Sequence, residues 1–231
     1  MKILAIDTSS KICSVSVLEN ANVIIEKHND DEKTHSQKLM PLIDETLKEV
    51  NLTLDSINLL ACCLGPGSFT GIRIGISTVK AFADVKHIPI IGVTSLESLA
   101  YNIENEGLIA SIIDAKHDNV YFALFNLSNG KYQTIVEPTS DEIRNLIPLL
   151  QQYDEKITFV GDGAEVHKNL LSIEINNPIF ASEAQNNQTS ISIGKSAYNK
   201  YNCDNYVKEY SVSPIYLKKS QAEINLENSK K

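Results

Sequence analysis

Hydrophobic and polar residues alternate along the first part of the chain, and this pattern predicts three β-strands. Residues 2–7 are mainly apolar, residues 13–18 alternate with a period of two, and residues 23–27 follow a polar turn. A period of two is typical of a strand because successive side chains point to opposite faces of a sheet. We therefore predict an antiparallel meander, followed by a polar loop at residues 28–33.

From residue 34 onward the spacing of apolar residues changes to that of a helix. Thr34 and Gln37 have the spacing of a capping box at its start, and Pro41 is expected either to kink the helix or to mark its first turn. Helices and strands then alternate. The expected elements are a buried strand at 57–64, a glycine-rich loop at 65–71, a helix at 72–85, a strand at 89–93 and a helix at 95–102.

The second half of the chain repeats this order. The expected elements are strands at 108–114, 120–127 and 131–136, a helix at 141–152, a strand at 156–160, a helix opening at 161–163 and a helix within 186–202. The predicted fold class is therefore α/β, with two related lobes of mixed sheets. We expect the first lobe at residues 1–104, the second at 105–219 and a loose polar tail at 220–231.

The charge balance and the cysteines narrow the function classes. Lys and Arg number 21 against 29 Asp and Glu among the 231 residues, so the net charge of −8 argues against unaided nucleic-acid binding. The four cysteines form no Cys-x-x-Cys pair, which indicates neither a zinc site nor a redox pair. We expect no secretory signal and no membrane-spanning segment, because no apolar run has the required length. The expectation is a reduced, cytoplasmic protein.

The glycine-rich loop at residues 65–71 lies between a predicted buried strand and a helix, where backbone N–H groups can bind an anion. It does not match the Walker A pattern, because Gly71 is followed by Ile72 and Arg73 instead of Lys and Ser or Thr. It also lacks the third glycine of a dinucleotide loop, where Thr70 stands. Two interpretations stay open, a tight turn that needs glycine or an anion site.

The helix after this loop has two apolar faces. Four residues share one face at about 100° per residue, namely Ile72, Ile76, Val79 and Ala83. Three others fall on nearly the opposite face, namely Ile74, Ala81 and Val85. An ordinary surface helix has a single apolar stripe. Either this helix is enclosed on both sides within its own domain, or its second face contacts another chain.

Five motifs run in a fixed order from residue 1 to about residue 219: MKILAIDTSSKICSVSV, THSQKLMPLID, GPGSFTGIRIGISTVKAFA, IDAKHDNVYFALF and SPIYLKK. Together they resemble the bacterial TsaB family, also called YeaZ. The resemblance implies a two-lobed fold of the ASKHA class (acetate kinase, Hsc70 and actin type) with an RNase H-like core in each lobe. It implies a part in forming N6-threonylcarbamoyladenosine (t6A) at position 37 of tRNAs that read codons starting with A.

In that family the protein is a noncatalytic partner, so the resemblance implies no enzyme activity for the chain alone. The implied partners are a TsaD-like paralogue that carries the transferase site and a TsaE-like ATPase. The chain would contact tRNA only through this complex, and alone it would form a homodimer. Any ATP or ADP would lie at the interface of the complex, and no other cofactor is implied. Six residues are predicted for partner or dimer contact: Leu39, Met40, Ile43, Ile74, Thr78 and Phe82.

The metal site of the paralogue has no counterpart in this sequence. TsaD-like proteins use both imidazoles of a His-x-x-x-His motif for a metal, and the matching positions here are Ser95 and Leu99. Neither side chain can replace an imidazole. The five histidines are scattered, with no two four residues apart: His28, His35, His87, His117 and His167.

Asp7 and Asp114 each follow the first predicted strand of a half. In ASKHA enzymes such a position holds a carboxylate near Mg-phosphate, whereas an Asx-type turn is the purely structural alternative. A weak nucleotide or anion site would comprise Asp7, Thr8, Gly67 and Ser68. The rival functions are an ATP-dependent small-molecule kinase using that site and a metallopeptidase-like protein, which the missing His pair disfavours. The C-terminal lysines (218, 219, 230 and 231) indicate a solvated tail or a minor tRNA contact within the complex.

Overall fold

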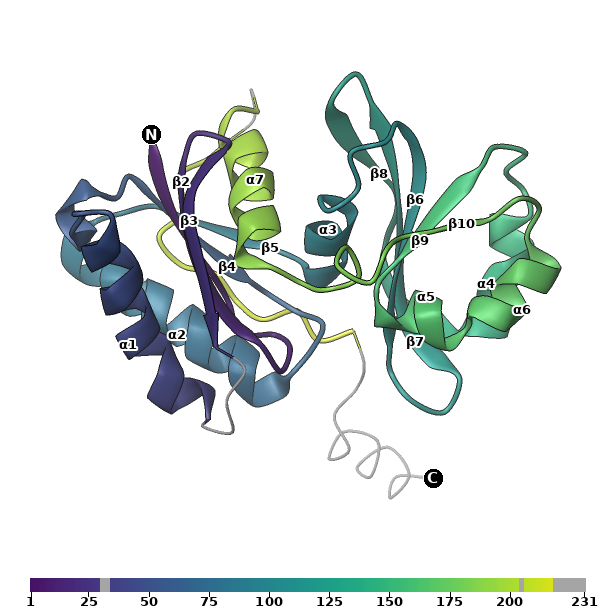
Figure 1. Ribbon diagram of the computed structural model, residues 1–231, viewed down its shortest axis with the longest axis horizontal. Helices are drawn as coiled ribbons and strands as arrows, with labels where there is room; N and C mark the ends of the chain where they lie inside the picture. The colour runs from purple at the N-terminus through teal and green to yellow at the C-terminus, as the bar shows by residue number, and fades with distance from the viewer. Residues whose placement is uncertain (30–33, 204–205, 218–231) are drawn as a thin grey trace.

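The computed structural model describes residues 1–29, 34–203 and 206–217 and contains two five-stranded sheets, each covered by helices (Figure 1). The strands of the first sheet are β1 (Lys2–Asp7), β2 (Cys13–Glu19), β3 (Asn22–Asn29), β4 (Leu59–Cys63) and β5 (Ile90–Val93). The helices of the first half are α1 (His35–Glu49), the 3-10 turn η1 (Leu54–Ser56), α2 (Phe69–Lys86) and α3 (Ser95–Ala100).

The strands of the second sheet are β6 (Gly107–Asp114), β7 (Asn119–Ser128), β8 (Lys131–Glu142), β9 (Ile157–Val160) and β10 (Ile179–Phe180). The helices of the second half are α4 (Ile143–Leu150), α5 (Asp162–Val166), α6 (Lys168–Glu174) and α7 (Ser190–Tyr201). No helix in these described ranges is both long and apolar enough to cross a lipid bilayer.

The two halves have the same topology. The first sheet has the order β3-β2-β1-β4-β5, and the second has the order β8-β7-β6-β9-β10. In each, the central strand pairs antiparallel with the strand that follows it and parallel with the strand that comes after a helix, as β1 does with β2 and β4. The predicted α/β class with two mixed sheets is confirmed.

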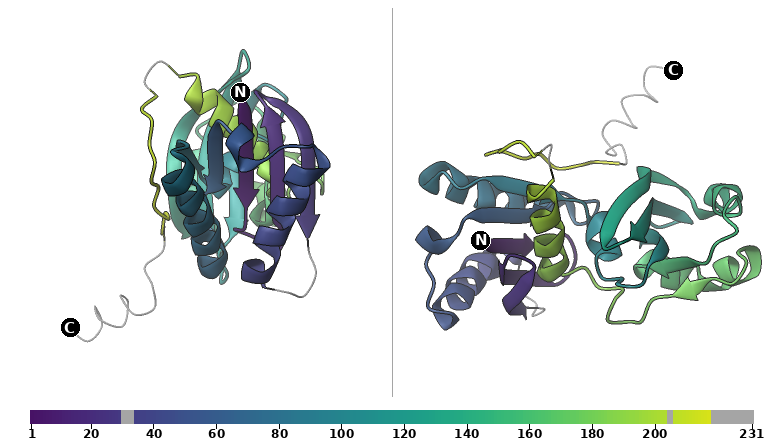
Figure 2. Two further views of the ribbon diagram at one scale, coloured as in Figure 1. Left: turned by 90° about the vertical axis from the view of Figure 1, so that its left-hand side faces the viewer. Right: turned by 90° about the horizontal axis from the view of Figure 1, so that it is seen from above.

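The helices form three layers around the two sheets (Figures 1 and 2). Helices α1 and α2 cover the outer face of the first sheet, α4, α5 and α6 cover the outer face of the second, and α3 and α7 lie between the sheets. The central helices are exchanged between the halves. Helix α7 packs on the first sheet through Ile193 and Ala197, whereas α3 packs on the second through Leu96 and Leu99.

The exchange of α7 corrects the predicted boundaries, in which all of residues 105–219 formed the second lobe. Helix α7 and the segment 206–217, which we call the return strap, both lie against the first sheet. The strap is fixed by two backbone hydrogen bonds, from Ile90 N–H to Glu209 O (2.7 Å) and from Ile215 N–H to Leu64 O (2.9 Å). Val212 is buried in the core beneath α1 and α2. The predicted tail at 220–231 lies outside the described residues.

Most predicted elements are present, with a few corrections. Helix α1 continues through Pro41, so this residue does not mark the first turn. Pro41 lies on the exposed side, where water can replace the helical N–H that proline lacks. Strand β8 extends to Glu142 and displaces the start of α4 to Ile143, and β3 extends over His28 and Asn29. Residues 30–33 of the predicted loop lie outside the described part. Helix α6 and strand β10 were not predicted.

Candidate functional site

Strand β1 ends at Asp7, whose carboxyl group closes an Asx-type turn. Its Oδ1 accepts hydrogen bonds from the backbone N–H and the hydroxyl of Ser9, both at 2.7 Å. The residue is 1% exposed, and its Oδ2 has no hydrogen-bond partner within the described chain. Burial raises the pKa of Asp7, although the hydrogen bonds from Ser9 and the nearby His35 act to lower it. The turn therefore engages one carboxyl oxygen of Asp7 and leaves the other buried without a partner in the described chain.

The glycine-rich loop packs directly on this turn. Thr8 Oγ1 donates to Gly71 O at 2.7 Å, and Ser68 N–H donates to Ser9 O at 2.7 Å. Ser68 Oγ accepts from Gly71 N–H at 3.2 Å and caps helix α2. A Cβ added to Gly67 would lie 2.4 Å from Ser9 O, and one added to Gly71 would lie 2.0 Å from Thr8 O. The four predicted nucleotide-site residues therefore lie together, but the contacts favour the tight-packing interpretation of the loop.

Ser95 and Leu99, which the resemblance matches to metal-binding histidines, face the protein interior. The Ser95 hydroxyl lies 3.0 Å from the Cys63 sulfur, and Leu99 is buried between α3 and the second sheet. Burial raises the pKa of Cys63 to about 12, so its thiol stays protonated and unreactive at neutral pH. Across residues 1–29, 34–203 and 206–217, no group of three or more His, Cys, Asp or Glu side chains could hold a metal ion.

Asp114 ends β6, the strand equivalent to β1, and also forms an Asx-type turn. Its Oδ1 accepts from Lys116 N–H at 2.9 Å, and its Oδ2 pairs with Lys116 Nζ at 2.5 Å. Partial burial acts to raise the pKa of Asp114, but the hydrogen bonds and charge of Lys116 lower it overall. The equivalent aspartates thus differ: Asp7 is buried and resists ionisation, whereas Asp114 is stabilised as a carboxylate by its own turn.

The inner sides of α1 and α2 form the core of the first lobe. Leu39 and Ile43 are 1% and 3% exposed and pack against the first sheet. The prediction that these two residues contact a partner is therefore wrong, because their side chains are already enclosed by their own lobe. The predicted inner face of α2 is confirmed, since all four of its members are buried: Ile72, Ile76, Val79 and Ala83.

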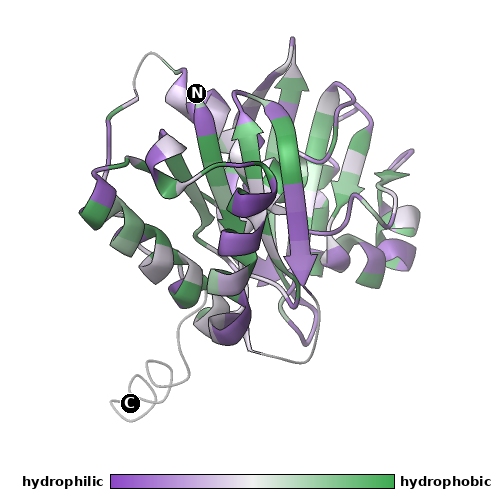
Figure 3. Cartoon of the chain, turned by 60° about the vertical axis from the view of Figure 1, so that its left-hand side comes forward, coloured by the Kyte–Doolittle hydropathy of each residue, from purple (hydrophilic) through white to green (hydrophobic). Residues whose placement is uncertain are grey.

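The outer sides of α1 and α2 remain open to solvent. Met40 is 51% exposed on α1, and Ala81 and Val85 are exposed on α2. The other three predicted contact residues are half-buried: Ile74, Thr78 and Phe82. Figure 3 shows hydrophobic colour on the outward side of α2, whereas α1 is mostly hydrophilic there. The second apolar face of α2 is thus not enclosed by the described part of its own chain.

An aromatic and guanidinium group lies at the start of α2 and was missed by the sequence prediction. We call Phe69, Arg73 and Tyr216 the Arg73 cluster. The Arg73 guanidinium carbon lies 3.8 Å from the centre of the Phe69 ring, and Arg73 Nε–H donates to the Tyr216 hydroxyl at 2.9 Å. The i, i+4 spacing of Phe69 and Arg73 could have revealed their contact. Tyr216 is 143 residues from Arg73, so no local pattern predicts it.

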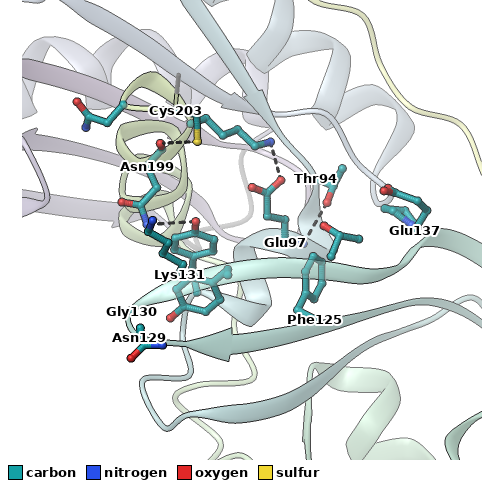
Figure 4. A pocket seen from close by; sticks show the side chains of 15 residues that line it. Thr94, Glu97, Phe125, Asn129, Gly130, Lys131, Glu137, Asn199 and Cys203 are labelled. Carbon is teal, nitrogen blue, oxygen red and sulfur yellow. Dashed lines mark hydrogen bonds and ion pairs between the residues drawn. The ribbon is translucent and has the colours of Figure 1, made fainter. Parts of the chain in front are cut away.

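A hollow of about 890 Å³ lies between the lobes and was also not predicted (Figure 4). Two of its lining residues, Glu97 of α3 and Lys200 of α7, form an ion pair with 2.7 Å between Oε2 and Nζ. Asn199 donates to the Tyr101 hydroxyl at 3.2 Å, and the Tyr101 and Tyr132 rings stack at 3.9 Å. The Glu97–Lys200 ion pair and the Asn199–Tyr101 hydrogen bond link α7 to α3 and its C-cap residue beside this hollow.

The whole chain can be compared with known proteins. A family model described as "TsaD: tRNA N6-adenosine threonylcarbamoyltransferase" matches residues 22–226. The "tRNA threonylcarbamoyladenosine biosynthesis protein TsaB" of Bacillus subtilis is 30% identical over 233 residues, covering 100% of both chains. The protein of the same name from Buchnera aphidicola subsp. Baizongia pistaciae is 30% identical over 93% of this chain and 97% of its own. Among solved structures, "YeaZ from Pseudomonas aeruginosa" has a TM-score of 0.74 at 22% identity, with 94% and 99% coverage.

The duplicated topology and these comparisons define a two-lobed α/β protein with a TsaD-type domain. Within that class the sequence relatives named TsaB match the chain over its full length. The chain belongs to the TsaB family, also called YeaZ.

Proposed function

We propose that this chain is a noncatalytic subunit in the formation of t6A at position 37 of tRNAs that read codons starting with A. It docks on a TsaD-type transferase through the outer side of α2 and the neighbouring part of α1. The observation that carries this proposal is the exposed second face of α2, since a helix that already buries one apolar stripe gains nothing from a second stripe in water.

The proposed role needs no catalytic group on this chain. Ser95 and Leu99 stand where the paralogue has its metal-binding histidines, and both side chains pack inside the protein. The kinase alternative draws no support from Asp7, which is 1% exposed and accepts from Ser9 within its own turn. The glycine loop does not support it either, because its Ser68 and Gly71 N–H groups are bonded within the chain. Any ATP or ADP is then held at the interface of the complex.

The remaining parts of the proposal concern partners and place. A TsaE-type ATPase joins the complex, and tRNA is bound through the complex because the acidic chain offers little for phosphate contact. Without its partner the chain pairs with a second copy through the same side of α1 and α2. The proposed location is the cytoplasm, where t6A is formed on tRNA.

The test is co-purification with a TsaD-type protein from the same organism, scored by mass after gel filtration with and without nucleotide. Ala81→Asp places a charge on the exposed side of α2 and should abolish a one-to-one complex while leaving the fold intact. Ile173→Asp is the matched control, because Ile173 is an exposed apolar residue on α6 of the other lobe. Titration calorimetry with Mg-ATP on the chain alone tests the kinase alternative, which tight binding with turnover would favour.

The proposal fails if the wild-type chain forms no complex, or if both variants bind equally well. Ile74→Asp is less decisive than Ala81→Asp. Ile74 packs partly against the core, so this substitution also strains the folded chain.

A further inference from the structure

The Arg73 cluster is exposed although its three side chains contact one another. Phe69 and Tyr216 are 51% and 49% exposed, and their ring centres are 5.2 Å apart. The guanidinium lies over the Phe69 ring at 3.8 Å, and its distance to the centre of the Tyr216 ring is 5.8 Å. Both distances lie within the range of cation–π attraction. The cluster therefore holds a long, flexible cation in one place on the surface.

The chemistry of this position depends on arginine and not on charge alone. The chain has 21 Lys and Arg residues, of which only Arg73 and Arg144 are arginine. A guanidinium is planar, stacks flat on aromatic rings and presents donors in a fixed fork, whereas a lysine ammonium is a compact point charge with neither the flat face nor the fork. With Nε–H bonded to Tyr216, the two terminal NH₂ groups keep the geometry that binds a carboxylate in bidentate fashion.

Tyr216 reaches the cluster from the far end of the sequence because the return strap is fixed on the first lobe. The residue before it, Ile215, donates its N–H to Leu64 O at 2.9 Å. Further along the strap, Val212 is buried among the core residues of the first lobe. The strap thus sets the Tyr216 ring and hydroxyl before any partner arrives, which lowers the entropy cost of ordering Arg73 on binding.

The charges around the cluster indicate what it can bind. No carboxylate among the described residues forms an ion pair with Arg73. On α1, Glu45 and Glu49 pair with Lys27, and Asp44 pairs with Lys48. A second copy would have to break an ion pair to supply a carboxylate from α1, which leaves Asp84 on the exposed side of α2 as the carboxylate of these two helices without an ion pair among the described residues.

We infer that the Arg73 cluster is the specificity-determining anchor for the protein partner, with Arg73 binding an aspartate or glutamate carboxylate of the TsaD-type subunit and Tyr216 acting as its positioning residue. This inference rests on the proposed function. Exposed Arg and aromatic residues in one group have the composition of interface hot spots. Phe69, Ile74 and Thr78 also border a shallow hollow of about 520 Å³ that takes an apolar side chain next to the carboxylate.

The experiment measures the affinity of the full-length chain for the TsaD-type protein by titration calorimetry at low and high salt. Arg73→Lys keeps the charge and should weaken binding about tenfold, equivalent to about 1.4 kcal/mol, with a smaller salt dependence than the wild type. Tyr216→Phe keeps the ring but loses the hydroxyl and should weaken binding about threefold, and Tyr216→Ala should weaken it as much as Arg73→Lys. Arg144→Lys is the matched control, because Arg144 is exposed on α4 of the other lobe.

Each outcome decides the matter. Wild-type affinity for Arg73→Lys overturns the inference and leaves the proposed function standing, whereas no binding by the wild type overturns the proposed function itself. If Arg73→Lys weakens only self-association of the chain alone, measured by sedimentation, the carboxylate belongs to a second copy and the inference is wrong. If it weakens only tRNA binding by the assembled complex, the anion is a phosphate and the inference is again wrong.

Discussion

Replacing Gly71 by alanine tests why the loop before α2 contains glycine. Gly71 is the third residue of α2, where alanine ordinarily gains about 0.5–1 kcal/mol over glycine from helix propensity. Here the added Cβ would lie 2.0 Å from the backbone oxygen of Thr8 and 3.1 Å from a ring carbon of His35. Backbone atoms at the end of β1 cannot rotate away as a side chain could. Either the start of α2 or the turn after β1 has to move.

The expected cost follows from the contacts that must yield. Overpacking of a tight site costs about 1–3 kcal/mol. Displacement of α2 also breaks the bond from Thr8 Oγ1 to Gly71 O, which is worth about 0.5–1.5 kcal/mol. These losses exceed the gain in helix propensity, so the free energy of unfolding should fall by about 1–3 kcal/mol. For a chain of this size the melting temperature should drop by roughly 2–12 °C.

The assay is urea unfolding followed by circular dichroism, with the thermal melt as a second measure. Ser77→Ala is the control, because Ser77 is exposed on the same helix and the change should lie within about 0.5 kcal/mol of the wild type. Equal stability of Gly71→Ala and Ser77→Ala would refute the packing explanation. Wild-type stability combined with loss of Mg-ATP binding would instead support the anion-site interpretation of the loop.

Three further predictions concern buried groups. Leu39→Ala should lower the free energy of unfolding by about 2–5 kcal/mol in urea, whereas Met40→Ala on the exposed side should change it by less than about 0.5 kcal/mol. The pKa of Asp7 is raised in the folded state, so the folded protein loses stability as pH rises above the ordinary value of 3.8. In melts from pH 4 to 8, the melting temperature of Asp7→Asn should therefore rise relative to that of the wild type. A difference in melting temperature that stays constant with pH would contradict this. Glu97→Gln weakens the link from α3 to α7 and should cost about 1 kcal/mol in urea unfolding, and a wild-type free energy of unfolding would contradict this.

The sequence predicted local elements well and long-range contacts poorly. Period-two and helical spacing located most strands and helices within a few residues, because each pattern reflects which side of an element is buried. The same spacing could not tell which face of α1 was buried by its own lobe, so Leu39 and Ile43 were assigned to a partner. The exchange of α3 and α7 was also missed, since apolar spacing shows that a helix packs without showing on which sheet.

In the candidate site, too, the local features could be predicted from the sequence and the long-range contacts could not. The turns at Asp7 and Asp114 depend on local chemistry, and the Asx-turn interpretation describes their hydrogen bonds. For the glycine loop, the tight-turn interpretation describes the close contacts. Tyr216 could not have been placed beside Arg73, because their contact depends on the path of the return strap over the first lobe. The raised pKa of Asp7 likewise depends on burial by residues that are distant in sequence.

The equivalent strands β1 and β6 end in different surroundings, and this difference bears on the proposed docking surface. Duplication places Asp7 and Asp114 at equivalent strand ends, yet the first is covered by a glycine loop and the second is neutralised by Lys116. Close packing of that loop on the β1 turn also fixes the start of α2, where Phe69 and Arg73 lie. The close contacts of Gly67 and Gly71 with the β1 turn thereby fix the position of the proposed contact surface. Gly71→Ala should therefore weaken partner binding as well as lower stability, although Gly71 itself is buried.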